Sequence, residues 1–260
     1  MDPAILVLAG RRSPATDPLA LRAGVTHKAM VPVGGEAMVG RVLRIAEQAF
    51  PGAALFVSVD DAAAIAGDPT VARLTAAGRL RTLEARPNIV DSVVAASQAT
   101  GFPLLITTAD NVLMTPDGMR VIAALGREGG ADAIAMMAER AAILAAHPDG
   151  QRRFYAFRGG AYSNCNLFWL GSDKALRATE SFRLGGQFAK HKRRAVKALG
   201  LTTLFLFVSR LLTLEGMFRH FSRRFGVRIV PLVTPDGRLA IDVDNERTFG
   251  VAEEILARAG

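Results

Sequence analysis

The sequence predicts an α/β protein: a three-layer α/β/α arrangement around a mixed, mainly parallel, Rossmann-like sheet, with a helical, basic insertion. Short apolar runs typical of strands alternate with longer stretches of helical periodicity. The first apolar run is continuous, as in a parallel strand that is buried on both faces. The length of 260 residues, 50% of them apolar, suits one large domain over 1–260.

The first half of the chain contains most of the predicted strands and helices. Residues 4–9 form a strand that Gly10 ends, and residues 36–50 form a helix because their apolar side chains recur on one helical face. Asp91 is placed to cap a helix over 92–100. Further strands are predicted at 53–59, 80–83, 104–108 and 133–137, and further helices at 70–77 and 116–127.

The second half starts with two strand-like runs, 154–157 and 166–170, that suit a hairpin. The pattern from 173 to 225 is mainly helical. Strands are then predicted at 227–233 and 239–243, and a closing helix at 245–259. Because residues 151–226 differ from the rest in charge and periodicity, we interpret them as an insertion or lid at the functional edge of the sheet.

The net positive charge of the chain comes entirely from its second half. Residues 1–130 carry 12 Lys and Arg against 12 Asp and Glu, whereas residues 131–260 carry 20 against 12, which gives the whole net charge of +8. Such an excess fits an anionic partner: a phosphorylated small molecule, an acidic lipid surface or nucleic acid. With only two Tyr and one Trp, the chain has few residues for base stacking, so nucleic acid is disfavoured. A solvated basic helix face is the alternative.

The single cysteine and the N-terminal sequence favour a cytoplasmic protein. Cys165 cannot belong to a disulfide framework, and a small buried apolar role suits it in a reducing compartment. No basic segment precedes the first apolar run, so no signal peptide is predicted. No apolar stretch approaches the roughly 20 residues that cross a bilayer.

The loop from Gly10 to Lys28 is the first candidate site. It follows a predicted strand, so its free backbone N–H groups lie at the carboxyl edge of the sheet, where open α/β folds bind ligands. Together with Arg11, Arg12 and Lys28, these amides form an anion cradle suited to a polyphosphate. An ordinary loop with solvated arginines is an equal alternative.

Acidic residues follow two other predicted strands. Asp110 comes after the strand at 104–108, and Asp242 and Asp244 follow the run at 239–243, on the same side of an extended segment. Carboxylates from two strand ends beside a phosphate-binding loop predict a Mg²⁺ site, because Mg²⁺ takes one or two carboxylates and completes its shell with water and phosphate oxygens. Alternatively, Asp110 stabilises a turn, and one of the later acidic residues or Asn245 caps the last helix.

The ordered set of these segments resembles the MobA-like nucleotidyltransferases. The family has a strand, a loop with Gly and Arg, a signature Lys and a segment like Val31-Pro32-Val33-Gly34-Gly35, here followed by Met38. Thr108-Ala109-Asp110 and Ile241-Asp242-Val243-Asp244 are similar to its two acidic segments. The resemblance covers roughly 1–130 and 227–260, and it implies a nucleotide-diphospho-sugar-transferase-like fold.

The resemblance also implies roles for individual residues. The nucleotide would be bound by Ala9, Gly10, Arg11, Arg12, Lys28, Asn88 and Ser92. The metal ligands would be Asp110, Asp242 and Asp244, and the catalytic residues Arg12, Lys28, Asp110 and Asp242. The implied cofactor is Mg²⁺, and the implied substrate an NTP.

The insertion is expected to select the acceptor. Asn164 and Asn166, together with Lys190 and Lys192, are the predicted acceptor-binding residues; a turn beside a core strand is the alternative for the two Asn. The basic helices suit an acceptor that bears a phosphate and a carboxylate, or peripheral contact with an anionic membrane. The insertion resembles that of MobA-like cytidylyltransferases that activate small phosphorylated groups for lipid head-group assembly, which implies CTP and an acceptor such as phosphoglycerate.

Two other functions compete with nucleotidyl transfer. A sugar-nucleotide glycosyltransferase shares the sheet topology and uses a D-x-D motif, but such enzymes carry it mid-chain, whereas Asp242-Val243-Asp244 lies near the end of this chain. A non-catalytic nucleotide-binding or membrane-docking protein is the other candidate, since the first loop is one Ala and one Gly shorter than the family's usual form. Release of pyrophosphate distinguishes nucleotidyl transfer from glycosyl transfer. Thermal stabilisation by nucleotides tests whether the protein is a non-catalytic one.

Overall fold

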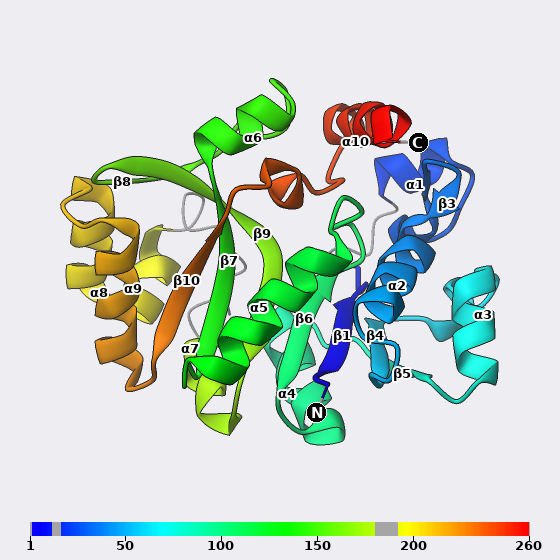
Figure 1. Ribbon diagram of the computed structural model, residues 1–260, viewed down its shortest axis with the longest axis horizontal. Helices are drawn as coiled ribbons and strands as arrows, with labels where there is room; N and C mark the ends of the chain where they lie inside the picture. Colours follow the sequence, from blue (N-terminus) through cyan, green and yellow to red (C-terminus); the bar gives the residue numbers. More distant parts are fainter. Residues whose placement is uncertain (1, 12–16, 180–191, 260) are drawn as a thin grey trace.

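Seven strands of the main sheet lie side by side in the order β10-β7-β9-β6-β1-β4-β5, and β8 extends the sheet by pairing with β9 (Figure 1). The computed structural model describes residues 2–11, 17–179 and 192–259, with the backbone alone for 192–199 and 259. The strands are β1 (Ala4–Leu8), β4 (Leu55–Val59), β5 (Leu80–Glu84), β6 (Leu104–Thr108), β7 (Ala133–Glu139), β8 (Tyr155–Phe157), β9 (Gly160–Leu170) and β10 (Ile229–Thr234), with a separate pair β2 (Pro32–Val33) and β3 (Glu36–Ala37).

The helices connect these strands along both faces of the sheet. They are α1 (Pro18–Arg22), α2 (Met38–Ala49), α3 (Pro69–Ala76), α4 (Ile89–Thr100), α5 (Pro116–Glu128), α6 (Arg140–Ala146), α7 (Leu176–Thr179), α8 (Lys192–Ser209), α9 (Leu214–Phe225) and α10 (Glu246–Ala259). Short 3₁₀ turns include η1 (Lys28–Met30), η2 (Ala62–Ala64) and η5 (Gly237–Ala240). The predicted α/β class with a mixed, mainly parallel sheet is confirmed.

Alternating side chains of β1 divide the core into two layers. Ile5 and Val7 pack with α2 and α5 on one face, whereas Leu6 packs with α4 on the other. All three side chains are fully buried, as the continuous apolar run predicts. The sheet therefore has helices on both sides, and its parallel strands β1, β4 and β6 end at one common edge, at the top of Figure 1.

β9 is the main departure from the predicted organisation. It runs antiparallel between β6 and β7 and buries Trp169 in the core, so residues 160–170 belong to the central sheet although they lie inside the range expected as an insertion. Because β9 runs in the opposite direction, its first half reaches the edge where β6 and β7 end. Met137 pairs with Asn164 and Ala135 with Phe168, so β9 bulges between these pairs.

Two local predictions were wrong. Residues 239–243 form no strand. Leu239 and Ala240 end the 3₁₀ turn η5 (Gly237–Ala240), which the Asp236 side chain caps by accepting the N–H of Arg238, and residues 241–244 have no regular secondary structure. Helix α4 begins at Ile89 rather than at Ser92, because Asn88 and not Asp91 accepts the backbone N–H that caps it.

Candidate active site

Three strand ends and one distant loop meet at the carboxyl edge of the sheet. Gly10 follows β1, Asp60 follows β4 and Asp110 follows β6, all from parallel strands. The segment after η5 is held beside them because the N–H of Val243 donates to the carbonyl oxygen of Asp110 at 3.0 Å. This bond joins residues 133 positions apart, so it places the segment around Val243 next to Asp110 at the edge of the sheet.

The carboxylates of Asp110, Asp242 and Asp244 form one cluster. Each offers an oxygen atom, and these three oxygens lie within 4.8 Å of one another. Hard oxygen ligands at this spacing match what a divalent cation such as Mg²⁺ requires. The structure therefore brings together the three residues that the sequence assigned to metal binding, from two segments of the chain.

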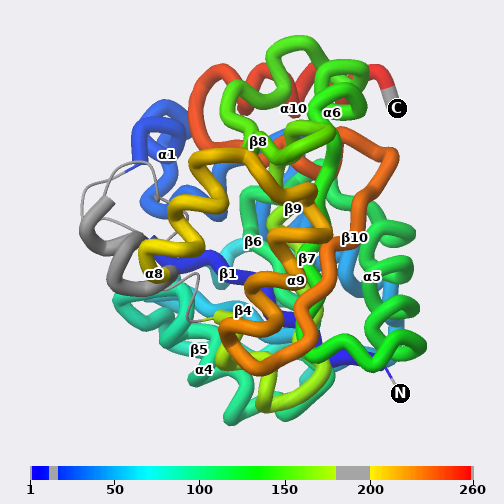
Figure 2. Tube along the Cα trace, turned by 90° about the vertical axis from the view of Figure 1, so that its left-hand side faces the viewer, coloured from blue at the N-terminus to red at the C-terminus, as the bar shows by residue number. Residues whose placement is uncertain are grey.

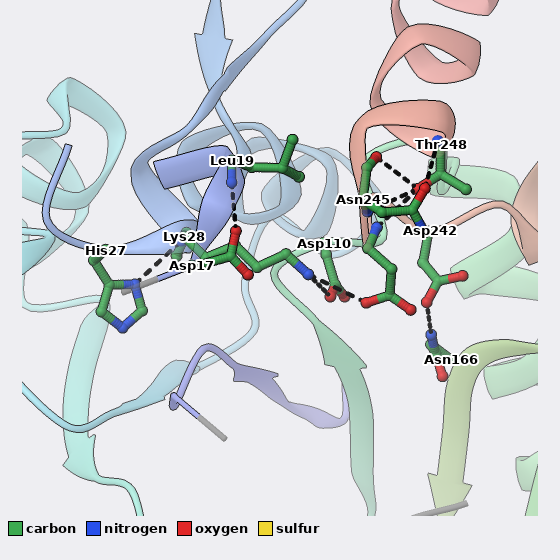
Figure 3. A network of polar contacts seen from close by, with 11 residues as sticks. Asp17, Leu19, His27, Lys28, Asp110, Asn166, Asp242, Asn245 and Thr248 are labelled. Atoms are coloured by element: carbon green, nitrogen blue, oxygen red, sulfur yellow. Dashed lines mark hydrogen bonds and ion pairs between the residues drawn. The ribbon is translucent and has the colours of Figure 1, made fainter. Parts of the chain in front are cut away.

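Lys28 provides the positive charge in this cluster (Figure 3). Its Nζ lies 2.9 Å from an oxygen of Asp110 and 3.2 Å from one of Asp244. Burial alone would lower the pKa of Lys28, but the charges of Asp110 and Asp244 outweigh it and raise the pKa above its ordinary value. Lys28 is thus an ammonium ion placed between two prospective metal ligands.

Asp242 is the most strongly perturbed acid of the site. Burial, followed by the negative charges of Asp110 and Asp244, raises its pKa to about 8. The side-chain amide of Asn166 donates to Asp242 at 3.2 Å, as the view in Figure 3 shows. Among the described residues, the positive charge beside the cluster does not offset its three carboxylates, and a divalent cation bound there would lower the pKa of Asp242.

The backbone of Asp244 is fixed by the start of α10. The Asn245 side chain accepts the N–H groups of Arg247 and Thr248, and the Thr248 hydroxyl accepts the N–H of Asp244 at 2.9 Å (Figure 3). Of the capping alternatives raised for this segment, the structure shows the one in which Asn245 caps the helix. The carboxylates of Asp242 and Asp244 remain in the cluster.

Asp60 connects the first loop to the Lys28 segment. Its carboxylate accepts both the backbone N–H and the Nε–H of Arg11, and it lies 3.1 Å from Nε2 of the buried His27. Since Nδ1 of His27 accepts the N–H of Ala29, Nε2 carries the proton and donates to Asp60. Burial alone would raise the pKa of Asp60, but the bonds from Arg11 and His27 lower it to about 2.

Asp60 was not among the residues predicted for the site. The signal was available, because Asp60 follows the predicted strand at 53–59 in the same way as Asp110 follows 104–108. The position of Lys28 depends on this contact, since Lys28 directly follows His27.

Replacing Asp60 by Asn is therefore expected to destabilise the protein, because Asn keeps one acceptor but loses the charge that holds Arg11. The Nε2–H group of His27, left with a weaker partner, should cost about 1–3 kcal/mol of stability. Thermal melting measures the effect. Asp61→Asn is the matched control, since Asp61 only caps η2; equal effects of the two changes would contradict the positioning role.

The other predicted nucleotide-binding residues lie near this edge in different roles. Ala9 donates to the carbonyl of Ser58, and a side chain at Gly10 would meet Ala85, with the two Cβ atoms 2.7 Å apart. Asn88 caps α4, and the Ser92 hydroxyl accepts the N–H of Arg86. Their contact with a nucleotide stays a prediction, and Arg12 lies outside the described residues.

The predicted acceptor residues are only partly described. Asn164 and Asn166 lie on the bulge of β9, where Asn166 has a φ of +49° and its backbone N–H donates to the Asn164 side chain. The left-handed conformation, which Asn tolerates, accompanies the contact of the Asn166 amide with Asp242. Lys190 lies outside the described residues, and of Lys192 the structure gives only the backbone, at the start of α8.

A scan against models of protein families found no match, and neither did a search of curated protein sequences. Solved structures do match. A hypothetical transferase from Thermus thermophilus has a TM-score of 0.76 at 23% identity, over 96% of this chain and 100% of its own.

Two further structures are more distant but also match over nearly their full length. A CMP:2-keto-3-deoxy-manno-octonic acid synthetase in complex with CTP has a TM-score of 0.59 at 12% identity, over 99% of each chain. A putative glucose-1-phosphate thymidylyltransferase from Bacillus anthracis has a TM-score of 0.53 at 11% identity, over 95% of this chain and 98% of its own. The fold is thus the nucleotide-diphospho-sugar-transferase-like fold, as the sequence predicts.

Proposed function

We propose that this protein is a Mg²⁺-dependent nucleotidyltransferase that joins an NMP to a small phosphorylated acceptor and releases pyrophosphate. The observation that supports the proposal most is the cluster of Asp110, Asp242 and Asp244 around Lys28 at the carboxyl edge of the sheet. In open α/β folds that edge is where ligands bind. The fold is shared with solved transferases for CMP and thymidylyl groups.

The chemistry needs little from the protein except position and charge. An oxygen of the acceptor phosphate attacks the α-phosphorus of the NTP, the bond from that phosphorus to the bridging oxygen breaks, and pyrophosphate leaves with the electron pair. A phosphate monoester has its second pKa at about 6, so the nucleophile is already anionic at neutral pH and no general base is required. This agrees with a site in which the charged groups of the cluster are three carboxylates and a lysine, which can position and stabilise phosphates without acting as a base.

The described residues divide this work between them. A cation held by Asp110, Asp242 and Asp244 would supply positive charge to the phosphate oxygens. Lys28 would bind the triphosphate and stabilise the charge that develops on it. The Gly10 loop would cradle phosphates through its N–H groups, with Asp60 fixing Arg11, and Arg12 is assigned there from the sequence alone.

The proposed nucleotide is CTP and the proposed acceptor a phosphorylated small acid such as phosphoglycerate. The support for CTP is the resemblance to MobA-like cytidylyltransferases, together with a neighbour of the same fold that was solved with CTP. Asn164, Asn166 and the basic residues Lys190 and Lys192 are the proposed acceptor contacts. We propose a cytoplasmic location, because the single Cys165 suits a reducing compartment. Independently of this, no helix among the described residues has both the length and the hydropathy of a membrane span.

A matrix of the four NTPs against phosphorylated acceptors, with release of pyrophosphate as the readout, tests the proposal. We expect pyrophosphate with CTP and phosphoglycerate in the presence of Mg²⁺, and none after chelation of Mg²⁺. Release with another NTP would correct the base and retain the reaction. Turnover of UDP-sugars that releases UDP without pyrophosphate would support the glycosyltransferase instead, and stabilisation by no nucleotide would support a non-catalytic protein.

A further inference from the structure

Helix α8 exposes large apolar side chains on its outer face. Leu201, Phe205 and Val208 are 72%, 64% and 70% exposed, and their spacing of four and three residues aligns them on one side of the helix. Leu211, just beyond the end of the helix, is 53% exposed. Four large apolar side chains thus face solvent in one short segment, which is uncommon on the surface of a soluble monomer.

The opposite face of α8 is anchored to the protein. The Phe207 ring lies 6.0 Å from that of Tyr155 and 5.9 Å from that of Phe157, both on β8. Thr203 is buried, and its hydroxyl is 2.8 Å from Nε2 of His220 on α9. The inner face of α8 therefore packs on β8 and α9, and its exposed outer face is available to a binding partner.

The surroundings of this face are strongly basic. Residues 192–228 contain nine Lys and Arg and a single acidic residue, Glu215. Among the described side chains, Arg210, Arg219 and Arg223 are exposed. In Figure 1, α8 and α9 lie together at the end of the molecule beyond β10, and Figure 2 looks directly onto that end.

We propose that the outer face of α8, with Leu201, Phe205, Val208 and Leu211, inserts into the surface of an anionic membrane while the surrounding arginines bind the lipid head groups. Apolar side chains flanked by Lys and Arg are the pattern of interfacial helices. A second copy of the chain fits less well, since a symmetric contact would bring the exposed Arg210, Arg219 and Arg223 of one copy close to those of the other. Nucleic acid supplies the negative charge but leaves the apolar residues without a partner.

This orientation would place the active site close to the membrane surface. Tyr155, which packs against Phe207 of α8, also experiences the charge of Asp242: burial and that charge raise the pKa of Tyr155. The contact of Phe207 with Tyr155 thus joins α8 to β8, and the strand paired with β8, β9, carries Asn166, which donates to Asp242. An acceptor or product attached to lipid would then reach the site without leaving the surface.

Sedimentation of the full-length protein with vesicles tests the inference. Binding is expected with vesicles of phosphatidylcholine and phosphatidylglycerol, weaker binding with phosphatidylcholine alone, and loss at high salt. Phe205→Glu should lower the partition coefficient at least tenfold. Arg219→Glu with Arg223→Glu should lower it by at least about 30-fold, since losing two basic residues that each contribute about 1 kcal/mol near an anionic surface already gives that factor. Val121→Glu on α5 is the matched control, with a similarly exposed apolar residue, and should change nothing.

The inference is overturned if the protein does not bind anionic vesicles at low salt, or if Phe205→Glu and Val121→Glu behave alike. A concentration-dependent dimer that Phe205→Glu dissociates, without any vesicle binding, would show that a second copy covers the face. Thermal melting of each variant confirms that it is folded. Because binding is measured without nucleotide, a negative result leaves the proposed transferase reaction untouched, and loss of that reaction leaves this inference untouched.

Discussion

Replacing Asp242 by Asn is expected to lower the rate of the proposed nucleotidyl transfer about 10³-fold, the scale of losing a principal electrostatic contact of a transition state. The same change should make the protein more stable at pH 8.5 when a chelator removes divalent cations. Both effects have one cause: Asp242 is held beside Asp110 and Asp244, an arrangement that suits a bound cation and is unfavourable without one.

The sign of the pH effect follows from the raised pKa. An unfolded Asp titrates near 3.9, whereas in the folded protein the pKa of Asp242 is about 8, so the folded state binds the proton more tightly. The stability contributed by this proton is fully present below about pH 4 and is lost as the pH rises to about 8. Asn carries no titrating group, so the variant should not show this part of the decline.

The decline of stability with pH is measured as the melting temperature of the wild type and of Asp242→Asn at several pH values between 5 and 8.5. The measurement is made first with chelator and then with Mg²⁺ and NTP. Asp236→Asn is the control with the opposite sign. Burial alone would raise the pKa of Asp236, but its bonds with Arg238 outweigh burial and lower it, so losing its charge should destabilise the protein at neutral pH. A wild-type protein whose melting temperature with chelator does not decline relative to that of Asp242→Asn would contradict the assignment.

Replacing Lys28 by Met is expected to lower kcat by about 10²–10³-fold and, without nucleotide, to tighten the binding of a divalent cation. The loss of rate follows from removing the cation proposed to stabilise the triphosphate. The tighter binding follows because the ammonium of Lys28 contacts Asp110 and Asp244 and so competes with a metal for the same oxygens. Calorimetric titration with Mg²⁺, or Mn²⁺ binding followed by electron paramagnetic resonance, measures the affinity.

Lys174→Met serves as the control. Lys174 is exposed and lies in η3 (Asp173–Ala175), after the end of β9 that pairs with the first residues of β6 and β7, so it is at the opposite edge of the sheet and should alter neither quantity. If Lys28→Met weakens the binding of the cation, Lys28 does not compete with it, and the proposed division of roles in the site is wrong. If the affinity for the divalent cation rises and kcat does not fall, Lys28 only balances the charge of the carboxylates when no metal is bound and does not act on the nucleotide.

The sequence was informative where a feature depends on local pattern. Continuous apolar runs identified the parallel strands, and parallel strands end at one edge, so Gly10 and Asp110 were correctly expected to meet. The Asp242 segment joins them as expected, but through the backbone bond from Val243 to Asp110 and not through a strand of its own. The strand predicted at 239–243 was wrong because so short an apolar run also suits the end of a buried 3₁₀ turn, here Leu239 and Ala240, followed by a segment that pairs with no strand. Periodicity cannot separate the two over so short a length.

Features that depend on distant partners could not be obtained from the sequence. Whether an acidic residue after a strand binds a ligand or a protein cation depends on what lies opposite, and Asp60 is engaged by Arg11 and His27. The bulge that brings Asn166 to Asp242 depends on how β9 pairs with β7. The exposed face of α8 depends equally on packing, because only the structure shows that Phe207 turns inward and Phe205 outward.

The backbone bond between Val243 and Asp110 has a consequence for the order in which the protein matures. Strands β1, β4 and β6 are complete once residue 108 has been synthesised, but the carboxylates that would hold a cation come together only after residue 244 has left the ribosome. A partly made chain can therefore assemble its first strands without acquiring the complete set of ligands. Premature stops before position 242 should yield products that lack catalysis altogether.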